Sequence, residues 1–281
     1  MSDKVLGDRI PEFGKPKAGG QANMGGGLGG VSIQSTRELM AVIAVAVLII
    51  GGAEWLLRVF EVPPFIMPTP SSIMAVFFSD ELPTIATHAG HTLVELFAGY
   101  AIGASIGLLL AALITQFPFA EKIITPYILL LVTTPMLALV PLLILNFGFG
   151  YTPRIIAVAL ASGPMVMINA ATGFRRVDLG KIALARSYGA STLQIFTKIR
   201  IPMAMPMVLV GLMMGAIFGL ITAVGAEMAG GGFGLGSRLT TYSSVIRMPE
   251  FFACILILAL MGILIYLLFF WLGKRLAGWE S

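Results

Sequence analysis

The strongest constraint on this chain is a series of long apolar stretches that carry no charge. A helix needs roughly 20 apolar residues to cross the hydrocarbon layer of a bilayer. Five stretches reach that length without a charged residue: Leu96–Ala120, Ile123–Thr152, Ile155–Phe174, Ile201–Ala226 and Phe251–Gly273. A sixth, Leu39–Phe60, is apolar up to Ala53 and then carries Glu54 and Arg58. Because the apolar residues run on continuously instead of alternating, we predict six membrane-spanning helices and not a β-barrel.

The composition supports a membrane protein and disfavours several soluble classes. Only 11% of the 281 residues are charged, whereas an ordinary soluble domain has roughly 25%. The net charge of +4 is too small and too scattered for a nucleic-acid binder. The single cysteine, Cys254, excludes an internal disulfide framework and a Cys-based zinc cluster. We therefore predict an all-α fold, that of a polytopic membrane protein.

The distribution of Lys and Arg predicts the orientation, because cytoplasmic loops carry an excess of both. With the N-terminus inside, 14 of the 18 Lys and Arg residues fall on the inner side. The other four fall outside or at span ends: Arg58, Arg154, Arg238 and Arg247. Both termini are therefore expected in the cytoplasm. The polar, glycine-rich residues 1–38 are predicted to form a disordered tail, followed by a membrane domain over residues 39–281.

The third span is predicted to be broken by proline. It contains three prolines, each of which removes a backbone donor: Pro126, Pro135 and Pro141. A broken helix at membrane depth is tolerated where it is buried or lines a cavity. The residues around the second proline are therefore candidates to line a pathway through the membrane, with ordinary packing as the alternative: Thr133, Thr134, Pro135 and Met136.

Polar residues within the apolar stretches are costly and are often functional. Asn169 is expected either to bridge helices or to touch a solute. Glu227 precedes a glycine-rich loop, residues 229–236, that we expect to be flexible, and we predict that it acts in a gate or pathway through an anchoring hydrogen bond. Glu54 and Glu95 lie near span ends, where we expect solvated or interfacial side chains.

Small residues recur every fourth position in two spans, as Gly99, Gly103 and Gly107 and as Gly211, Gly215 and Gly219. Such a stripe lets another helix backbone approach closely. We predict tight packing within the bundle, and the alternative is a stripe that lines a dimer seam or a pore.

The longest inner connection, residues 175–202, is predicted to be a pair of capped helices. Asp178 is a favourable N-cap, Gly189 can take the left-handed conformation that ends a helix, and Ser191 with Gln194 has capping-box spacing. Pro202 begins the next span, where a missing N–H costs little. The pair has apolar residues for one side, so it is expected to dock either on a soluble partner or on the membrane interface.

This connection resembles a known family signature. Ala183-Leu-Ala-Arg-Ser-Tyr-Gly189 is followed after nine residues by Ile199-Arg-Ile-Pro202. The pattern is similar to the coupling loop of ABC importer permeases, E-A-A-x3-G-x9-I-x-L-P. The leading Glu is Ala183 here, so a salt bridge of that Glu cannot form, whereas an apolar docking surface can. Further stretches, Pro135–Gly150, Asn169–Asp178 and Ala226–Gly236, look like the branch that imports nitrate, bicarbonate, taurine and other sulfonates.

The resemblance implies a type I ABC importer permease in a bacterial cytoplasmic (inner) membrane. It implies two ATPase subunits, an extracytoplasmic substrate-binding protein, and a second permease copy as a homodimer or a close paralogue. The expected solute is a small anion, with flavin or pyrimidine-like cargo as the runner-up. Carried over by position, the ATPase-coupling residues are Asp178, Ala183, Ala185, Gly189, Ala190, Ser191, Ile199 and Pro202.

The chain is not expected to be an enzyme or to hold a cofactor or metal. Gly231–Ser237 has the glycines of a phosphate-binding loop but lacks its Lys, so ATP and Mg are expected in the partner ATPase. Gly103-Ala-Ser105-Ile-Gly107 matches a hydrolase pattern but lies within an apolar helix. The alternative function is a secondary transporter or channel without an ATPase, which predicts a buried charge relay and paired broken helices.

Overall fold

The computed structural model describes residues 36–276, and residues 1–35 and 277–281 lie outside the described part. Within it the regular structure is helical throughout, with no strand. The elements are α1 (Thr36–Val59), α2 (Pro70–Val76), α3 (Leu82–Gln116), α4 (Pro118–Thr133), α5 (Met136–Phe147), α6 (Tyr151–Arg175), α7 (Leu179–Ser187), α8 (Thr192–Ile195), the π-helical turn η2 (Phe196–Arg200), α9 (Ile201–Gly230), α10 (Leu235–Ser244) and α11 (Met248–Leu276). Most of the predicted N-terminal tail therefore lies outside the described residues.

The chain divides into two compact units, Met1–Ala53 and Glu54–Ser281. The described part of the first unit is the N-terminal portion of α1, which is an apolar helix. The second unit contains the remaining helices and all the contacts discussed below.

The number of spans agrees with the sequence prediction. Five helical segments are long and apolar enough to cross a membrane, and they contain α1, α3, α6, α9 and α11. The pair α4 and α5 supplies a sixth if it counts as one span, and its two helices meet at an angle of 96°. The bend falls at Pro135, because a residue that precedes proline is pushed into an extended conformation, and Thr134 has ψ 124°.

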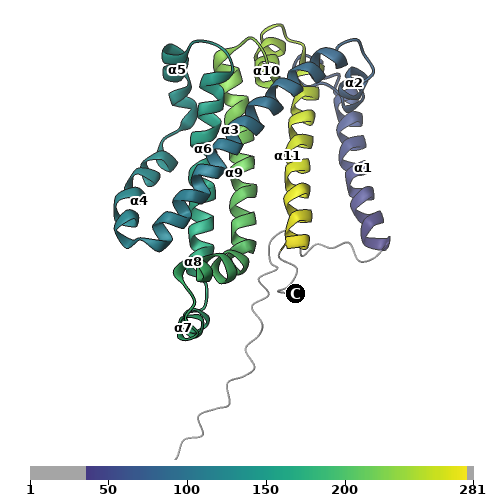
Figure 1. The fold of residues 1–281 in the computed structure, drawn as a ribbon. Helices are drawn as coiled ribbons and strands as arrows, with labels where there is room; N and C mark the ends of the chain where they lie inside the picture. The colour runs from purple at the N-terminus through teal and green to yellow at the C-terminus, as the bar shows by residue number, and fades with distance from the viewer. Residues whose placement is uncertain (1–35, 277–281) are drawn as a thin grey trace, which may run out of the picture. The chain divides into compact units, whose positions relative to one another are not determined.

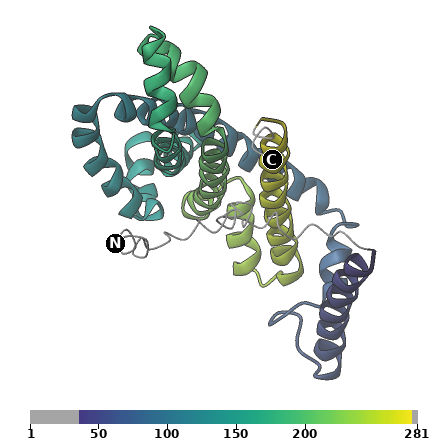
Figure 2. The ribbon, with the colours of Figure 1, turned by 90° about the horizontal axis from the view of Figure 1, so that it is seen from below.

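The centre of the second unit is a tight packing of α3, α6 and α9 (Figure 1). In that view α3 runs obliquely across the other two, and Figure 2 shows α6 and α9 nearly end-on beside one another. Both glycine stripes face α6. A Cβ atom added at Gly103 would lie 2.5 Å from the carbonyl oxygen of Ala159, and one at Gly215 would lie 3.1 Å from that of Ser162. The stripes therefore serve packing within the chain, as predicted.

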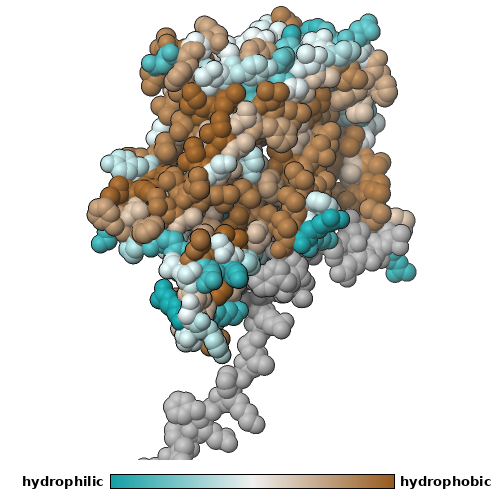
Figure 3. Space-filling view, viewed as in Figure 1, coloured by the Kyte–Doolittle hydropathy of each residue, from teal (hydrophilic) through white to brown (hydrophobic). Residues whose placement is uncertain are grey.

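The two ends of this unit differ. The helix pair α7 and α8 lies at one end, and α10 lies at the other (Figure 1). Between them a band of hydrophobic side chains covers α3, α4 and α9, whereas hydrophilic side chains gather near α7 and near α10 (Figure 3). Large apolar side chains of α3 such as Phe97 and Leu109 are exposed, which suits contact with lipid.

Candidate functional site

The helix pair at the α7 end has the local structure that its sequence predicts. The Asp178 side chain caps α7 by accepting the Gly180 N–H at 2.8 Å. Gly189 follows the helix with φ +78°, a conformation that side-chain-bearing residues rarely adopt. Ser191 and Gln194 then form a complete capping box at the start of α8, with bonds of 3.3 and 2.8 Å.

A small apolar core holds the two short helices together. Val177, Ile182 and Ile195 are buried, and Ala185, Ala190 and Ile199 pack against them. Three of the predicted coupling positions therefore face inward and fix the shape of the pair, together with Met203 of α9.

The outer surface of the pair carries a different set of apolar residues. Leu184, Tyr188 and Leu193 are exposed, Tyr188 to 84%. Ala183 is exposed as well, in the place of the acidic residue of the family signature. The apolar side expected from the sequence is thus divided between an inner core and a set of exposed side chains. A hollow of about 450 Å³ opens beside Gly189, between Tyr188 and Lys198.

The pair continues directly into the membrane helix α9. The connecting turn η2 is π-helical, and the N–H of Ile201 bonds the carbonyl of Phe196. Pro202, which has no N–H, is the second residue of α9, as predicted. No irregular linker separates α8 from α9, because Thr192–Gly230 is one continuous helical segment.

The polar side chains of the predicted pathway residues around Pro135 and at Asn169 bond to their own helices. The hydroxyl of Thr133 donates to the Leu129 carbonyl at 3.0 Å, and that of Thr134 donates to Leu130 at 2.7 Å. The Asn169 amide donates to Met165 at 2.8 Å, one turn earlier in α6. Each of these bonds stays within the local helix, so the role of Thr133, Thr134, Pro135, Met136 and Asn169 stays a prediction.

A buried polar cluster lies at the opposite end, near α10. Glu95 of α3 pairs with Arg154 of α6 at 2.7 Å, and their side chains are 0% and 2% exposed. The expectation that Glu95 is solvated is therefore wrong, because the carboxylate is enclosed where three helices meet. The Glu54 side chain is 21% exposed, pairs with Arg58 and accepts from the backbone N–H and hydroxyl of Ser71.

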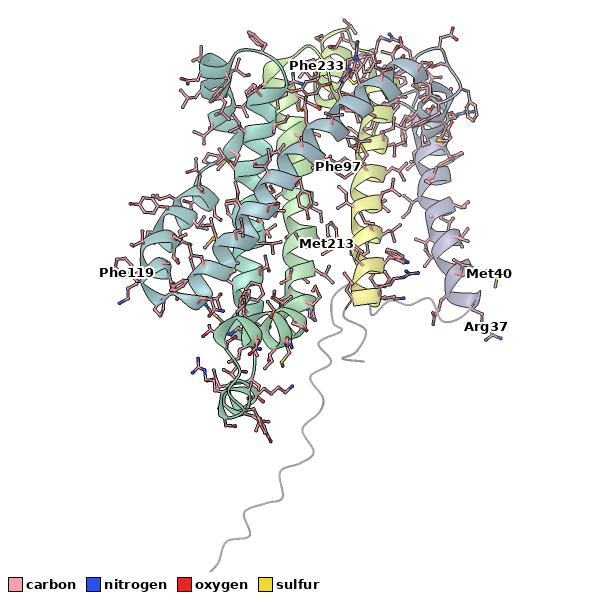
Figure 4. All side chains as sticks on the ribbon, in the orientation of Figure 1. Arg37, Met40, Phe97, Phe119, Met213 and Phe233 are labelled. Carbon is pink, nitrogen blue, oxygen red and sulfur yellow. The ribbon has the colours of Figure 1, made fainter. Side chains whose placement is uncertain are left out.

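Arg154 also fixes the loop that connects α9 to α10. Its Nη1 donates to the Phe233 carbonyl at 3.0 Å, and its Nη2 donates to the Gly231 carbonyl. The guanidinium carbon lies 4.2 Å from the centre of the Phe233 ring. Figure 4 shows Phe233 at the α10 end of the helices, whereas Phe97 and Met213 lie further along α3 and α9.

The other face of the same loop is held by its N–H groups. Glu227 Oε2 accepts from Gly236 N at 2.6 Å, which is the anchoring bond expected of this residue. His88 Nδ1 accepts from Gly234 N, and Thr92 Oγ1 accepts from Leu235 N, both at 2.9 Å. Three consecutive N–H groups are thus bonded to buried side chains. The loop expected to be flexible is therefore closely fixed.

An ion-pair network lies at the surface near this end. Arg247 contacts Glu81 at 2.6 Å and Glu250 at 2.7 Å, and the Tyr242 hydroxyl donates to Glu81 at 3.1 Å. The bond from Arg247 holds the pKa of Glu81 below its ordinary value. Burial, with the neighbouring Glu81 carboxylate, raises the pKa of Tyr242 to about 12. The network ties α10 and the start of α11 to the residue before α3.

The sequence did not indicate Arg154 as a member of a site. In the sequence, Arg154 contributes only to the distribution of Lys and Arg that predicts the orientation. Its partner Glu95 is 59 positions earlier, so no local pattern joins the two. The one signal in the sequence is a cation at the very start of an otherwise apolar span.

The fold, with the capped helix pair at the start of α9, is that of an all-α membrane protein. The chain belongs to the family described as binding-protein-dependent transport system inner membrane component, whose model matches residues 103–278. Family membership favours an ABC importer permease over the alternative of a secondary transporter.

Named relatives cover most of the chain. It is 29% identical over 246 residues to the putative aliphatic sulfonates transport permease protein SsuC of Bacillus subtilis, covering 86% of each chain. It is 28% identical to the taurine transport system permease protein TauC of Escherichia coli, over 78% of this chain and 82% of that one. It is 26% identical to the riboflavin transport system permease protein RibX of Chloroflexus aurantiacus, again over 78% and 82%.

A solved structure shows the same fold. A chain from inward-facing conformations of the MetNI methionine ABC transporter matches with a TM-score of 0.55 and 17% identity. The match covers 69% of this chain and 95% of that chain.

Proposed function

We propose that this chain is the permease subunit of an ATP-driven importer, and that the pair α7–Gly189–α8 couples it to a separate ATPase. The observation that carries the proposal is the exposed apolar face of Leu184, Tyr188 and Leu193 on a capped pair fused to α9. Exposed apolar side chains on a rigid element are typical of an interaction site. The pair also carries the cations Lys181 and Arg186, which the positive-inside rule assigns to the cytoplasm.

The proposed mechanism is a shift between two packings of the helices, biased by the partner. ATP binding and hydrolysis, with Mg, take place in the ATPase subunits, and this chain is not the enzyme. Closure of the ATPase pair moves α7 and α8, and η2 passes that movement to α9. The close contacts of α9 and α3 with α6, at Gly215 and Gly103, favour movement of the three helices as one body.

A second permease copy, as a homodimer or with a paralogue, completes the pathway, and an extracytoplasmic binding protein delivers the solute. The membrane is the bacterial cytoplasmic membrane, with both termini on the cytoplasmic side. We propose a small anion such as a sulfonate as the solute, supported by the names of SsuC and TauC. A flavin or pyrimidine-like cargo is the second candidate, supported by the name of RibX.

Reconstitution tests the proposal. The chain is purified in detergent with the ATPase subunit of its own system and placed in proteoliposomes with the binding protein. The proposal predicts uptake of the solute only with ATP, and ATPase activity that rises with loaded binding protein. Failure of the chain to retain an ATPase subunit, together with uptake that does not depend on ATP, would overturn it.

A further inference from the structure

The charges of the buried cluster do not balance if every group is ionised. Glu95 and Glu227 are both 0% exposed and supply two carboxylates, whereas Arg154 supplies one guanidinium. An uncompensated charge in an apolar interior is very costly and is normally neutralised. The cluster therefore needs one more positive charge, which a proton can supply.

The imidazole of His88, which bonds the loop, does not provide that charge. His88 accepts the Gly234 N–H at Nδ1, so this nitrogen holds no proton and the imidazole is neutral. His91 Nδ1 bonds the Tyr151 hydroxyl. The next cation, Arg238 of α10, has His88 and the Glu81 carboxylate among its electrostatic neighbours.

The oxygens of the two carboxyl groups show where the proton belongs. Glu95 uses Oε1 for Arg154, and its buried Oε2 has no hydrogen-bond partner in the described part of the chain. Glu227 uses Oε2 for Gly236, and its buried Oε1 is also without a partner. The two carboxyl groups lie within hydrogen-bond reach of each other. Two acceptors can bond only if one of them carries a proton.

We propose that Glu95 and Glu227 share one proton, which makes the cluster neutral and keeps the 231–236 loop docked. Two carboxylates held together in a site from which water is excluded bind one proton between them. With the proton in place, both free oxygens are satisfied, Arg154 is matched by a single negative charge, and Glu227 remains an acceptor for Gly236.

The shared proton links protonation to the position of the loop. Undocking the loop removes Gly236 from Glu227 and the carbonyls of Gly231 and Phe233 from Arg154, and lets water reach both carboxyl groups. The proton then passes to water, and a proton is taken up again when the loop docks. The shared proton is inferred from the geometry of the buried cluster alone. Its place in a transport cycle rests on the proposed function.

Infrared spectroscopy of the purified chain tests the proton directly. A protonated carboxyl has a C=O stretch separate from the carboxylate bands. At neutral pH we expect one such band from the wild-type chain, absent from both Glu95→Gln and Glu227→Gln, since the single carboxyl that remains in the cluster is ionised and balances the charge of Arg154. Absence of the band from the wild type, or its persistence in either variant, would overturn the proposal.

Thiol labelling tests the link to the loop. Ser237 is 5% exposed beside the loop, and Ser244 is exposed on the same helix. Ser237→Cys should label slowly relative to Ser244→Cys, and Glu227→Gln should keep that ratio within about twofold. In the double variant Glu95→Gln with Glu227→Gln, the guanidinium loses its counter-charge, and the ratio should rise about 100-fold or more. Glu227→Gln that labels as fast as the double variant would contradict the proposal.

The two measurements require no ATPase subunit and no uptake of solute. A chain that shows the band and the slow labelling but fails in proteoliposomes would contradict the proposed function and leave the shared proton in place.

Discussion

Gly189 is the position at which the coupling proposal can be tested with a defined energy. It has φ +78°, and an added Cβ atom there meets nothing within 4 Å. Replacement by Ala therefore causes no clash and acts only through the backbone conformation. A left-handed conformation costs an L-residue roughly 1–2 kcal/mol. That cost corresponds to a decrease of about 5–30-fold in the population of the native turn.

The assay is ATPase activity stimulated by loaded binding protein, measured with uptake in the same proteoliposomes. Gly189→Ala should lower both, by up to that factor, because the docking face is correctly shaped only with the native turn. Gly189→Asn should lose less, since Asn tolerates positive φ better than other residues. Gly189→Leu should lose at least as much as the Ala variant.

The control is Gly148, which also has a positive φ, +75°, with ψ −179°, and nothing within 4 Å of an added Cβ atom. It follows α5, outside the coupling pair, so Gly148→Ala should leave the ratio of stimulated to basal ATPase activity unchanged. Normal stimulation in Gly189→Ala, or an equal loss of stimulation in Gly148→Ala, would refute the reasoning.

Three further variants test the packing and the charges by thermal unfolding in detergent. Gly103→Leu should lower the unfolding midpoint strongly, because even its Cβ atom would overlap the α6 backbone. The control Gly90→Ala, where an added Cβ atom meets nothing within 4 Å, should leave the midpoint unchanged. Equal midpoints in the two variants would count against the packing of α3 on α6. Arg154→Met should cost about 3–5 kcal/mol of stability by leaving a carboxylate buried without its partner. The control Arg58→Met removes a pair whose arginine is 67% exposed and should change stability little. Similar losses in the two variants would show that the buried pair contributes no more to stability than the exposed one. The pKa of Glu81 is lowered on folding, so its contribution to stability is present above its ordinary pKa and is lost as the pH falls through the lower folded value. Glu81→Gln should therefore lower the midpoint at neutral pH and flatten its fall toward acid, and an unchanged acid limb would contradict this.

Features that depend on neighbouring residues in the chain were predictable from the sequence. The caps at Asp178 and Ser191 and the turn at Gly189 each involve groups within three positions, so their signals are local. The bend at Pro135 follows equally from the chemistry of one residue. The apolar stretches gave the spans, because their length is set by the thickness of the bilayer.

The polar cluster depends on contacts between distant parts of the chain, and no local pattern reports them. Glu95 and Arg154 are 59 positions apart, and His88 reaches the loop across 146. Each alone looks like an interfacial residue at a span end. Only the folded arrangement of α3, α6 and α9 shows that they enclose one another.

The division of the apolar side of the coupling pair also required the structure. Ile199 and Leu193 are both apolar and six positions apart, yet one packs inward and the other is exposed. Apolar character alone does not say which side of the pair a residue takes, and the turn at Gly189 separates α7 from α8, so no single helical period runs through the whole pair. The roles of the coupling residues remain predictions, because the partner that would contact them is a different chain.

The central claim is that the pair α7–Gly189–α8 contacts an ATPase. A photo-crosslinking amino acid placed at Tyr188 tests this claim in the assembled complex, because that side chain is 84% exposed. The control is the same amino acid at Leu145 of α5, whose side chain is 83% exposed. The account predicts a crosslink from position 188 to the ATPase subunit and none from position 145. Absence of an ATPase crosslink at 188 in a complex that retains the subunit, or labelling of 188 from outside the cell, would contradict it.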